Sequence, residues 1–76
     1  MRAYVFVKVA AGREREVLEA LQAIPTLEEI NFLFGEYDYI LTVQASDTAA
    51  LGRLIETRIR SAPGIVQTMT LLEAPI

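Results

Sequence analysis

The residues able to do chemistry in this chain belong to a narrow set of types. Its 76 residues include neither cysteine nor histidine. Thiolate nucleophiles, sulfur ligands, the commonest general base and the commonest metal ligand are therefore all missing. The segment after the first predicted strand, Ala10-Ala11-Gly12-Arg13, offers one glycine and one arginine, which are too few for an anion-binding loop. We therefore predict a protein that is not an enzyme and that uses no metal and no cofactor.

Two short segments hold the polar groups that remain as candidates for binding a ligand. The first runs from Gly35 to Asp38, and the second comprises Gln67, Thr68 and Thr70. Each residue type also has an ordinary structural role, because glycine allows a positive φ in a turn, aspartate caps turns and threonine favours strands. The residue types alone leave both roles open.

The balance of charge argues against nucleic acid as a partner. The formal net charge is −3, and the seven basic residues are dispersed along the chain. Binding to phosphate backbones needs a concentration of basic side chains, which this sequence lacks. No apolar run approaches the roughly 20 residues that span a bilayer, and no basic segment precedes an apolar one at the start. We expect a cytoplasmic protein that contacts neither nucleic acid nor membrane directly.

Hydrophobic periodicity in the first half of the chain predicts a strand, a helix and a second strand. In residues 3–9, one side of the chain carries Ala3, Val5, Val7 and Val9 and the other carries Tyr4, Phe6 and Lys8, a period of two that is typical of a strand. Residues 13–23 carry apolar side chains at helical spacing, and Pro25 ends this predicted helix. Residues 27–34 have the composition of the second strand.

The second half predicts a strand, a helix and a final strand. Residues 37–45 form the third predicted strand, and a turn at Gly35-Glu36 joins it to the second in an antiparallel hairpin. Ser46-Asp47 offers an N-cap for a second helix, which Pro63-Gly64 closes. Residues 65–73 form the last strand. The apolar stripe of the second helix comprises Leu51, Leu54, Ile55 and Ile59.

The two halves match one another when the sequence is shifted by 38 residues. Val5 then falls on Val43, and Pro25 falls on Pro63. Such a match indicates two copies of a βαβ unit. We predict that residues 1–76 form a single α+β domain with the ferredoxin-like βαββαβ sandwich, in which two helices cover one face of a four-stranded antiparallel sheet.

Alternation along the strands leaves the other face of this predicted sheet uncovered. If Val5 and Val43 point toward the helices, Tyr4 and Phe6 point away from them. An aromatic patch of this kind is rarely left exposed on a monomer, and a second copy of the same sheet would cover it. We therefore predict a homodimer through this open face. The predicted interface residues are Tyr4, Phe6, Ile30, Phe32, Ile40 and Thr42, and Phe34 is a further candidate.

The segment Gly35 to Val43, Gly-Glu-Tyr-Asp-Tyr-Ile-Leu-Thr-Val, resembles the hairpin of the ligand-binding (RAM) domain of leucine-responsive/AsnC-type regulators, the Lrp/AsnC family. Ile24-Pro25, Ser46-Asp47 and Pro63-Gly64-Ile65 occur in the order of that family, so the likeness covers nearly the whole chain. Met1 leads straight into the first strand. The resemblance therefore implies a stand-alone form without the helix-turn-helix that precedes this domain in the regulators.

The resemblance also implies an amino-acid-sensing oligomer. Family members form sheet-to-sheet dimers that associate into larger rings and bind amino acids where dimers meet. The implied role is to modulate transcription or amino-acid metabolism through full-length Lrp/AsnC regulators or other partners. The implied ligand-binding residues are Gly35, Glu36, Tyr37, Asp38, Gln67, Thr68 and Thr70.

An amino-acid ligand needs acceptors for its ammonium and donors for its carboxylate. We expect Asp38 to accept from the ammonium, the amides around Gly35 and Glu36 to hold the carboxylate, and Tyr37 to form a wall, whereas Tyr39 should face the core.

Two alternatives remain open, an ACT-type regulatory domain and a purely structural oligomerisation adaptor. A small ferredoxin-like enzyme, such as an acylphosphatase-like hydrolase or a small monooxygenase, is disfavoured by the lack of catalytic groups.

Overall fold

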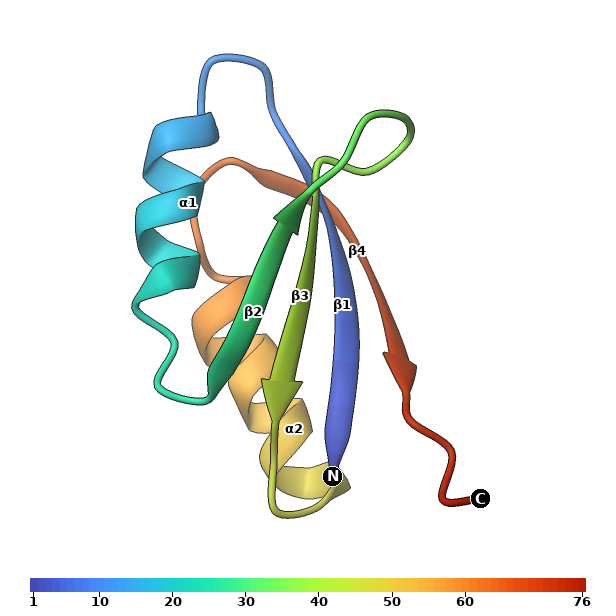
Figure 1. The fold of residues 1–76 in the computed structure, drawn as a ribbon. Helices are drawn as coiled ribbons and strands as arrows, with labels where there is room; N and C mark the ends of the chain where they lie inside the picture. Colours follow the sequence, from blue (N-terminus) through green and yellow to red (C-terminus); the bar gives the residue numbers. More distant parts are fainter.

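The computed structural model describes all 76 residues as a four-stranded sheet with both helices on one face (Figure 1). The strand order is β2-β3-β1-β4, and all neighbouring strands are antiparallel. This arrangement confirms the predicted ferredoxin-like sandwich. The elements in chain order are β1 (Arg2–Val9), α1 (Glu14–Gln22), β2 (Leu27–Phe32), β3 (Tyr39–Gln44), α2 (Thr48–Leu54), the π-helical turn η1 (Ile55–Ile59) and β4 (Ile65–Leu72).

Apolar side chains fill the space between the sheet and the helices. Val5 of β1, Leu41 of β3 and Leu21 of α1 have no exposed surface, and no charged residue is buried. Tyr39 is only 7% exposed, which confirms that it faces the core. Burial of each such side chain contributes about 1.5–3 kcal/mol, so the helix-covered face supplies most of the stability.

The edge strand β2 departs from the prediction, because the pairing register shifts between Leu27 and Glu29. After this bulge Ile30 pairs with Leu41, a core residue, and packs against the core. Phe32 pairs with Tyr39, and the two ring centroids lie 5.4 Å apart. The prediction that Ile30 and Phe32 lie on the open face is therefore wrong, since an extra residue in a strand moves all later side chains to the opposite face.

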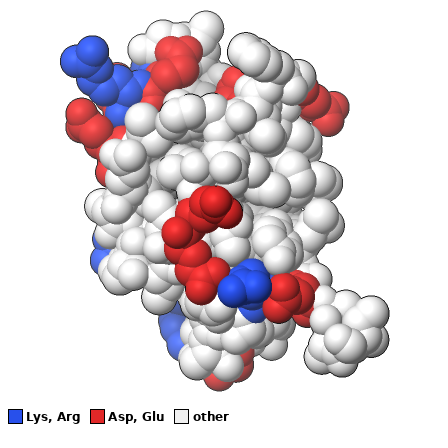
Figure 2. Space-filling view, in the orientation of Figure 1, with Lys and Arg blue, Asp and Glu red and all other residues white.

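The open face carries the other predicted interface residues. Tyr4 pairs with Thr42 and Phe6 pairs with Ile40, and all four side chains are partly exposed. Figure 2 shows that this face is largely free of charge, with a few charged groups gathered toward its lower end. Phe34 belongs to neither face, because it lies in the connection after β2 and is fully exposed.

The second helix begins as predicted and ends differently. The Asp47 side chain caps it by accepting a hydrogen bond from the Ala50 N–H at 2.8 Å. Its last turn is π-helical, since the Arg60 N–H donates to the Ile55 carbonyl at 2.8 Å. Gly64 then takes a φ of 98° at the entry to β4. Neither helix is long and apolar enough to cross a membrane.

Candidate ligand-binding site

The connection between β2 and β3 spans residues 33–38 and is longer than the predicted two-residue turn. The Leu33 N–H closes it by donating to the Asp38 carbonyl at 2.8 Å. Gly35 has a φ of 123°, a value that side chains with a Cβ rarely adopt, so its predicted role in the turn is confirmed. The exposed tip leaves the Gly35 and Glu36 positions open to solvent.

Asp38 anchors this connection to β1 instead of capping its own hairpin. Its carboxylate Oδ2 accepts a hydrogen bond from the Val9 N–H at 2.7 Å, and its own N–H donates to the Val7 carbonyl at 2.9 Å. The Val9 bond lies where the pairing of β1 with β4 changes register, between Lys8 and Val9. The side chain therefore extends the contact of β3 with β1 beyond their last paired residues, Val7 and Tyr39, and it still has one carboxylate oxygen to offer.

Tyr37 joins the two candidate segments on the open side of the sheet. Its ring packs against Phe6 with centroids 5.5 Å apart, and its hydroxyl accepts a hydrogen bond from Gln67 Nε2 at 3.3 Å. Gln67 pairs with Lys8 in the sheet, on the same face as Phe6. The structure thus brings the Gly35 to Asp38 segment next to the beginning of β4.

Thr68 and Thr70 lie on the opposite side of the sheet from Gln67. They pair with Val7 and Val5, whose side chains belong to the core. The sheet therefore separates these two hydroxyls from the Tyr37–Gln67 pair, and one chain alone does not bring all seven candidate residues together.

The buried Tyr39 hydroxyl lies near the start of α1 and is influenced by the charges of Glu14 and Asp38. Its hydroxyl donates a hydrogen bond to the Glu14 carbonyl at 3.3 Å. Burial raises the pKa of the Tyr39 phenol, and the negative charges of Glu14 and Asp38 raise it further. This hydroxyl therefore stays protonated and ties β3 to the start of α1.

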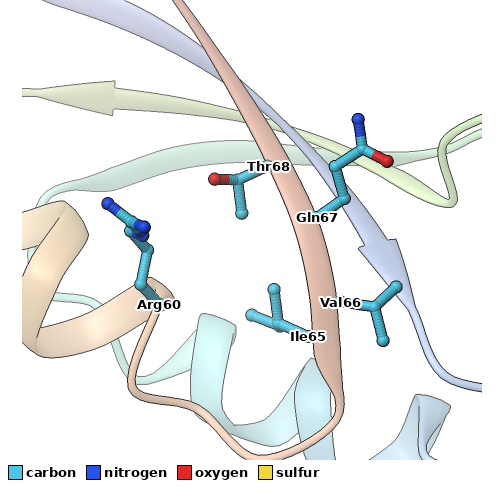
Figure 3. A pocket seen from close by; sticks show the side chains of 5 residues that line it. All are labelled: Arg60, Ile65, Val66, Gln67 and Thr68. Carbon is cyan, nitrogen blue, oxygen red and sulfur yellow. The ribbon is translucent and has the colours of Figure 1, made fainter.

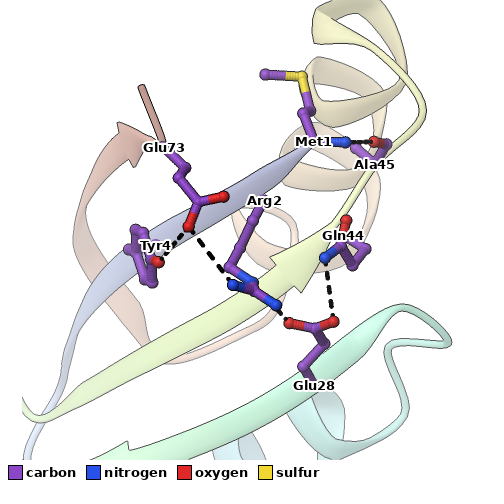
Figure 4. Close-up of polar contacts among 7 residues, drawn as sticks. All are labelled: Met1, Arg2, Tyr4, Glu28, Gln44, Ala45 and Glu73. Carbon is purple, nitrogen blue, oxygen red and sulfur yellow. Dashed lines mark hydrogen bonds and ion pairs between the residues drawn. The ribbon is translucent and has the colours of Figure 1, made fainter. Parts of the chain in front are cut away.

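A second polar cluster, which the sequence did not reveal, lies at the far end of the open face (Figure 4). Arg2 contacts Glu28 at 3.0 Å and Glu73 at 3.5 Å, and Tyr4 donates to Glu73 at 3.0 Å. Gln44 also donates to Glu28, at 3.1 Å. The hydrogen bonds from Gln44 and Arg2 lower the pKa of Glu28. Glu28 lies where the pairing of β2 with β3 shifts register, between Leu27 and Glu29.

Comparison with known proteins gives a consistent set of relatives. The family model described as the Lrp/AsnC ligand binding domain matches residues 2–74. The HTH-type transcriptional regulator PH1916 of Pyrococcus horikoshii is 36% identical over 59 residues, which are 78% of this chain and 39% of that protein. The regulator FL11 of the same organism is 31% identical over 72 residues, 95% of this chain and 47% of that protein. The chain thus spans less than half of these relatives.

One match lies outside the regulators. A homocitrate synthase of Sulfurisphaera tokodaii is 36% identical over 56 residues, which are 74% of this chain and 12% of that enzyme.

Solved structures agree with the family match. The crystal structure of FFRP-DM1 is 37% identical, superposes with a TM-score of 0.89, and the match covers 96% of this chain and 97% of that one. Two structures at 18% and 22% identity share the fold, with TM-scores of 0.86 and 0.72. They are complexes with L-methionine of the regulator NMB0573 from Neisseria meningitidis and of a feast or famine regulatory protein from M. tuberculosis.

Proposed function

Because this chain belongs to the Lrp/AsnC ligand-binding domain family, we propose that it is an oligomeric module that senses an amino acid. The observation that carries the proposal is the meeting of the two candidate segments through Tyr37 and Gln67, beside the Asp38 carboxylate. The L-methionine bound in two more distant relatives supports an amino acid as the class of ligand.

In the proposed complex, the free carboxylate oxygen of Asp38 accepts from the ligand's ammonium while Oδ2 keeps its bond to Val9. Backbone amides at Gly35 and Glu36 donate to the ligand's carboxylate, and Tyr37 forms a wall. Hydrogen bonds to charged groups contribute about 1.5–3 kcal/mol each. Because Thr68 and Thr70 lie on the other side of the sheet, they reach a shared ligand only from a second copy of the chain.

We further propose that the module dimerises through its open sheet face and that dimers associate into larger assemblies. Support comes from the partly exposed apolar side chains on that face, where Met69 and Leu71 of β4 lie beside Phe6 and Tyr4. A twofold contact between identical faces would cover both patches at once. The assembly then modulates transcription or amino-acid metabolism through full-length Lrp/AsnC regulators or other partners.

Thermal unfolding in the presence of each of the twenty amino acids, with the mass measured by light scattering, tests this proposal. Ligand at about 100 times its Kd stabilises the native state by about 2.7 kcal/mol, which in a domain of this size raises Tm by about 10 °C or more. We expect one or a few amino acids to give such a shift on a dimer or larger ring. No shift with any of them would favour the structural adaptor.

Regulation of a biosynthetic enzyme is the second candidate, and the homocitrate synthase match favours it. Native mass spectrometry of the chain mixed with a full-length Lrp/AsnC regulator separates the two candidates. Mixed oligomers support the regulator partner, whereas their absence, together with an amino-acid-dependent complex with a synthase, supports the enzyme.

A further inference from the structure

The chain contains two sulfur atoms, those of Met1 and Met69, and neither cysteine nor tryptophan. Without thiols, these two thioethers are the side-chain groups that a mild peroxide oxidises. In the single chain the two side chains are equally accessible, since Met1 is 41% exposed and Met69 is 40% exposed. Their surroundings differ, so Met1 serves as an internal control for Met69.

Met69 lies on the open side of the sheet. Figure 3 shows the Gln67 and Thr68 side chains leaving β4 on opposite sides of the strand. Alternation returns Met69 to the side of Gln67, and the register agrees, because Met69 pairs with Phe6. Leu71 follows on the same side and is 49% exposed. Met69 therefore belongs to the apolar surface that the proposed dimer would cover.

Met1 lies outside that surface. It precedes β1, and its backbone is held by Ala45, whose carbonyl accepts from the N-terminal ammonium at 2.6 Å. The Ala45 N–H in turn donates to the Met1 carbonyl at 2.9 Å. Figure 4 shows the Met1 side chain directed away from the Arg2 and Tyr4 side chains of the open face. Oxidation of Met1 should therefore leave that face unchanged.

We propose that Met69 is a redox-sensitive switch of the dimer, an inference that rests on the proposed contact through the open face. Hydrogen peroxide transfers one oxygen atom to the thioether. The S=O bond forms as the O–O bond breaks, sulfur loses two electrons, and water is released. The sulfoxide is polar and accepts hydrogen bonds, whereas its neighbours Phe6 and Leu71 have no side-chain donor. Its burial in the contact is therefore unfavourable.

The switch is reversible and acts on the free chain. A sulfoxide formed while Met69 is exposed keeps the chain monomeric, and methionine sulfoxide reductases, which take their two electrons from thiols, restore the thioether and the dimer. The dimer in turn protects Met69 by covering it. Peptide mass spectrometry should therefore find Met1 and Met69 oxidised at similar rates in dilute protein, and Met69 several-fold more slowly than Met1 in concentrated protein.

Light scattering before and after peroxide treatment tests the effect on association. We expect the dimer Kd of the oxidised wild type to rise by at least about tenfold. Met69→Leu keeps the side-chain volume and retains Met1, so its dimer should survive the treatment. Met69→Gln should weaken the dimer without peroxide. Leu72→Gln is the matched control, since Leu72 is 47% exposed on the same strand but pairs with Ala3, whose side chain faces the core.

Two results would overturn the switch while leaving the dimer in place. The first is an unchanged Kd in a wild type whose Met69 is shown to be oxidised. The second is an equal rise of Kd in oxidised wild type and oxidised Met69→Leu, which would assign the effect to Met1 or to general damage. An untreated wild type that is monomeric at every concentration would instead refute the proposed dimer, and the switch with it.

Discussion

The two faces of the sheet are built from alternate residues of the same strands, yet they differ in how completely their side chains are buried. On the helix side, Val5, Val7, Leu41 and Val43 are completely buried. On the open side, Tyr4, Phe6 and Ile40 remain partly exposed, and Met69 and Leu71 of β4 are 40% and 49% exposed. The chain therefore completes one face by itself and leaves the other incomplete.

This contrast separates stability from assembly. The helix side needs nothing beyond the chain, because α1, α2 and η1 cover it. The open side presents apolar surface that no element of the chain covers. The Tyr37–Gln67 contact lies on this side, next to Phe6. We expect substitutions on the first face to change unfolding and substitutions on the second to change association.

The largest effect should come from Leu41→Ala, paired with Ile40→Ala on the adjacent residue. Leu41 is fully buried in the core, so its truncation should lower the free energy of unfolding by about 2–5 kcal/mol. Ile40 faces the open side. At protein concentrations where the chain is monomeric, its truncation should lower the free energy of unfolding much less than that of Leu41. Urea unfolding at low concentration measures both, and equal losses would contradict the contrast between the faces.

Phe6→Glu should act on the open face with little effect on the fold. A charge buried in the proposed sheet-to-sheet contact costs several kcal/mol by order of magnitude, so the dimer should dissociate. Arg15→Glu, an exposed change on α1, is the control. Light scattering gives the mass of each variant, and a Phe6→Glu protein with unaltered mass would remove this face from the interface.

Gly64→Ala should destabilise the junction between the two layers by about 1–3 kcal/mol. Its φ of 98° disfavours a Cβ, and that Cβ would lie 2.7 Å from Arg13 Cβ. Gly52→Ala in α2 meets no atom within 4 Å and should instead stabilise the helix by about 0.5–1 kcal/mol. Thermal unfolding of the two variants should therefore move in opposite directions, and a shared direction would argue against strain at Gly64.

The smallest effect should come from the charged cluster around Arg2. Hydrogen bonds from Gln44 and Arg2 lower the pKa of Glu28 below its ordinary value of 4.5, so the folded state favours the ionised carboxylate. Its contribution is fully present above that ordinary value and is lost as the pH falls through the lowered pKa. Glu28→Gln should therefore reduce the fall in stability in this acidic range while changing stability only slightly at pH 7. Urea unfolding midpoints measured over a series of pH values give this pH dependence. If the wild-type and Glu28→Gln profiles run parallel, Glu28 does not contribute to the pH dependence of stability.

Much of the architecture could be predicted from the sequence, because alternation and helical spacing are local patterns. The alternation in β1 and β3 correctly assigned Tyr4, Phe6, Ile40 and Thr42 to the open face. The same reasoning failed at Ile30 and Phe32, since a bulge depends on pairing with β3 and leaves no mark in the pattern of β2. The π turn at the end of the second helix was not predicted either, because the apolar stripe of that segment fits an ordinary α-helix.

The candidate site was harder to predict, because its geometry depends on contacts between distant segments. The role of Gly35 in the turn could be predicted, because it follows from the residue type alone. The hydrogen bond from the Val9 N–H to Asp38 could not, because it joins residues 29 positions apart. Likewise, the alternation of β4 implies that Gln67 and Thr68 lie on opposite faces, but only the register with β1 shows which of them meets Tyr37.

The most direct test of the central claim is to titrate Asp38→Asn with the amino acid that stabilises the wild type. Asparagine retains an oxygen that can accept from the Val9 N–H but removes the charge proposed to hold the ligand's ammonium. The account predicts that Asp38→Asn keeps the wild-type mass and nearly the wild-type Tm without ligand, and that the ligand no longer raises its Tm. A ligand-induced rise as large as that of the wild type would contradict the account.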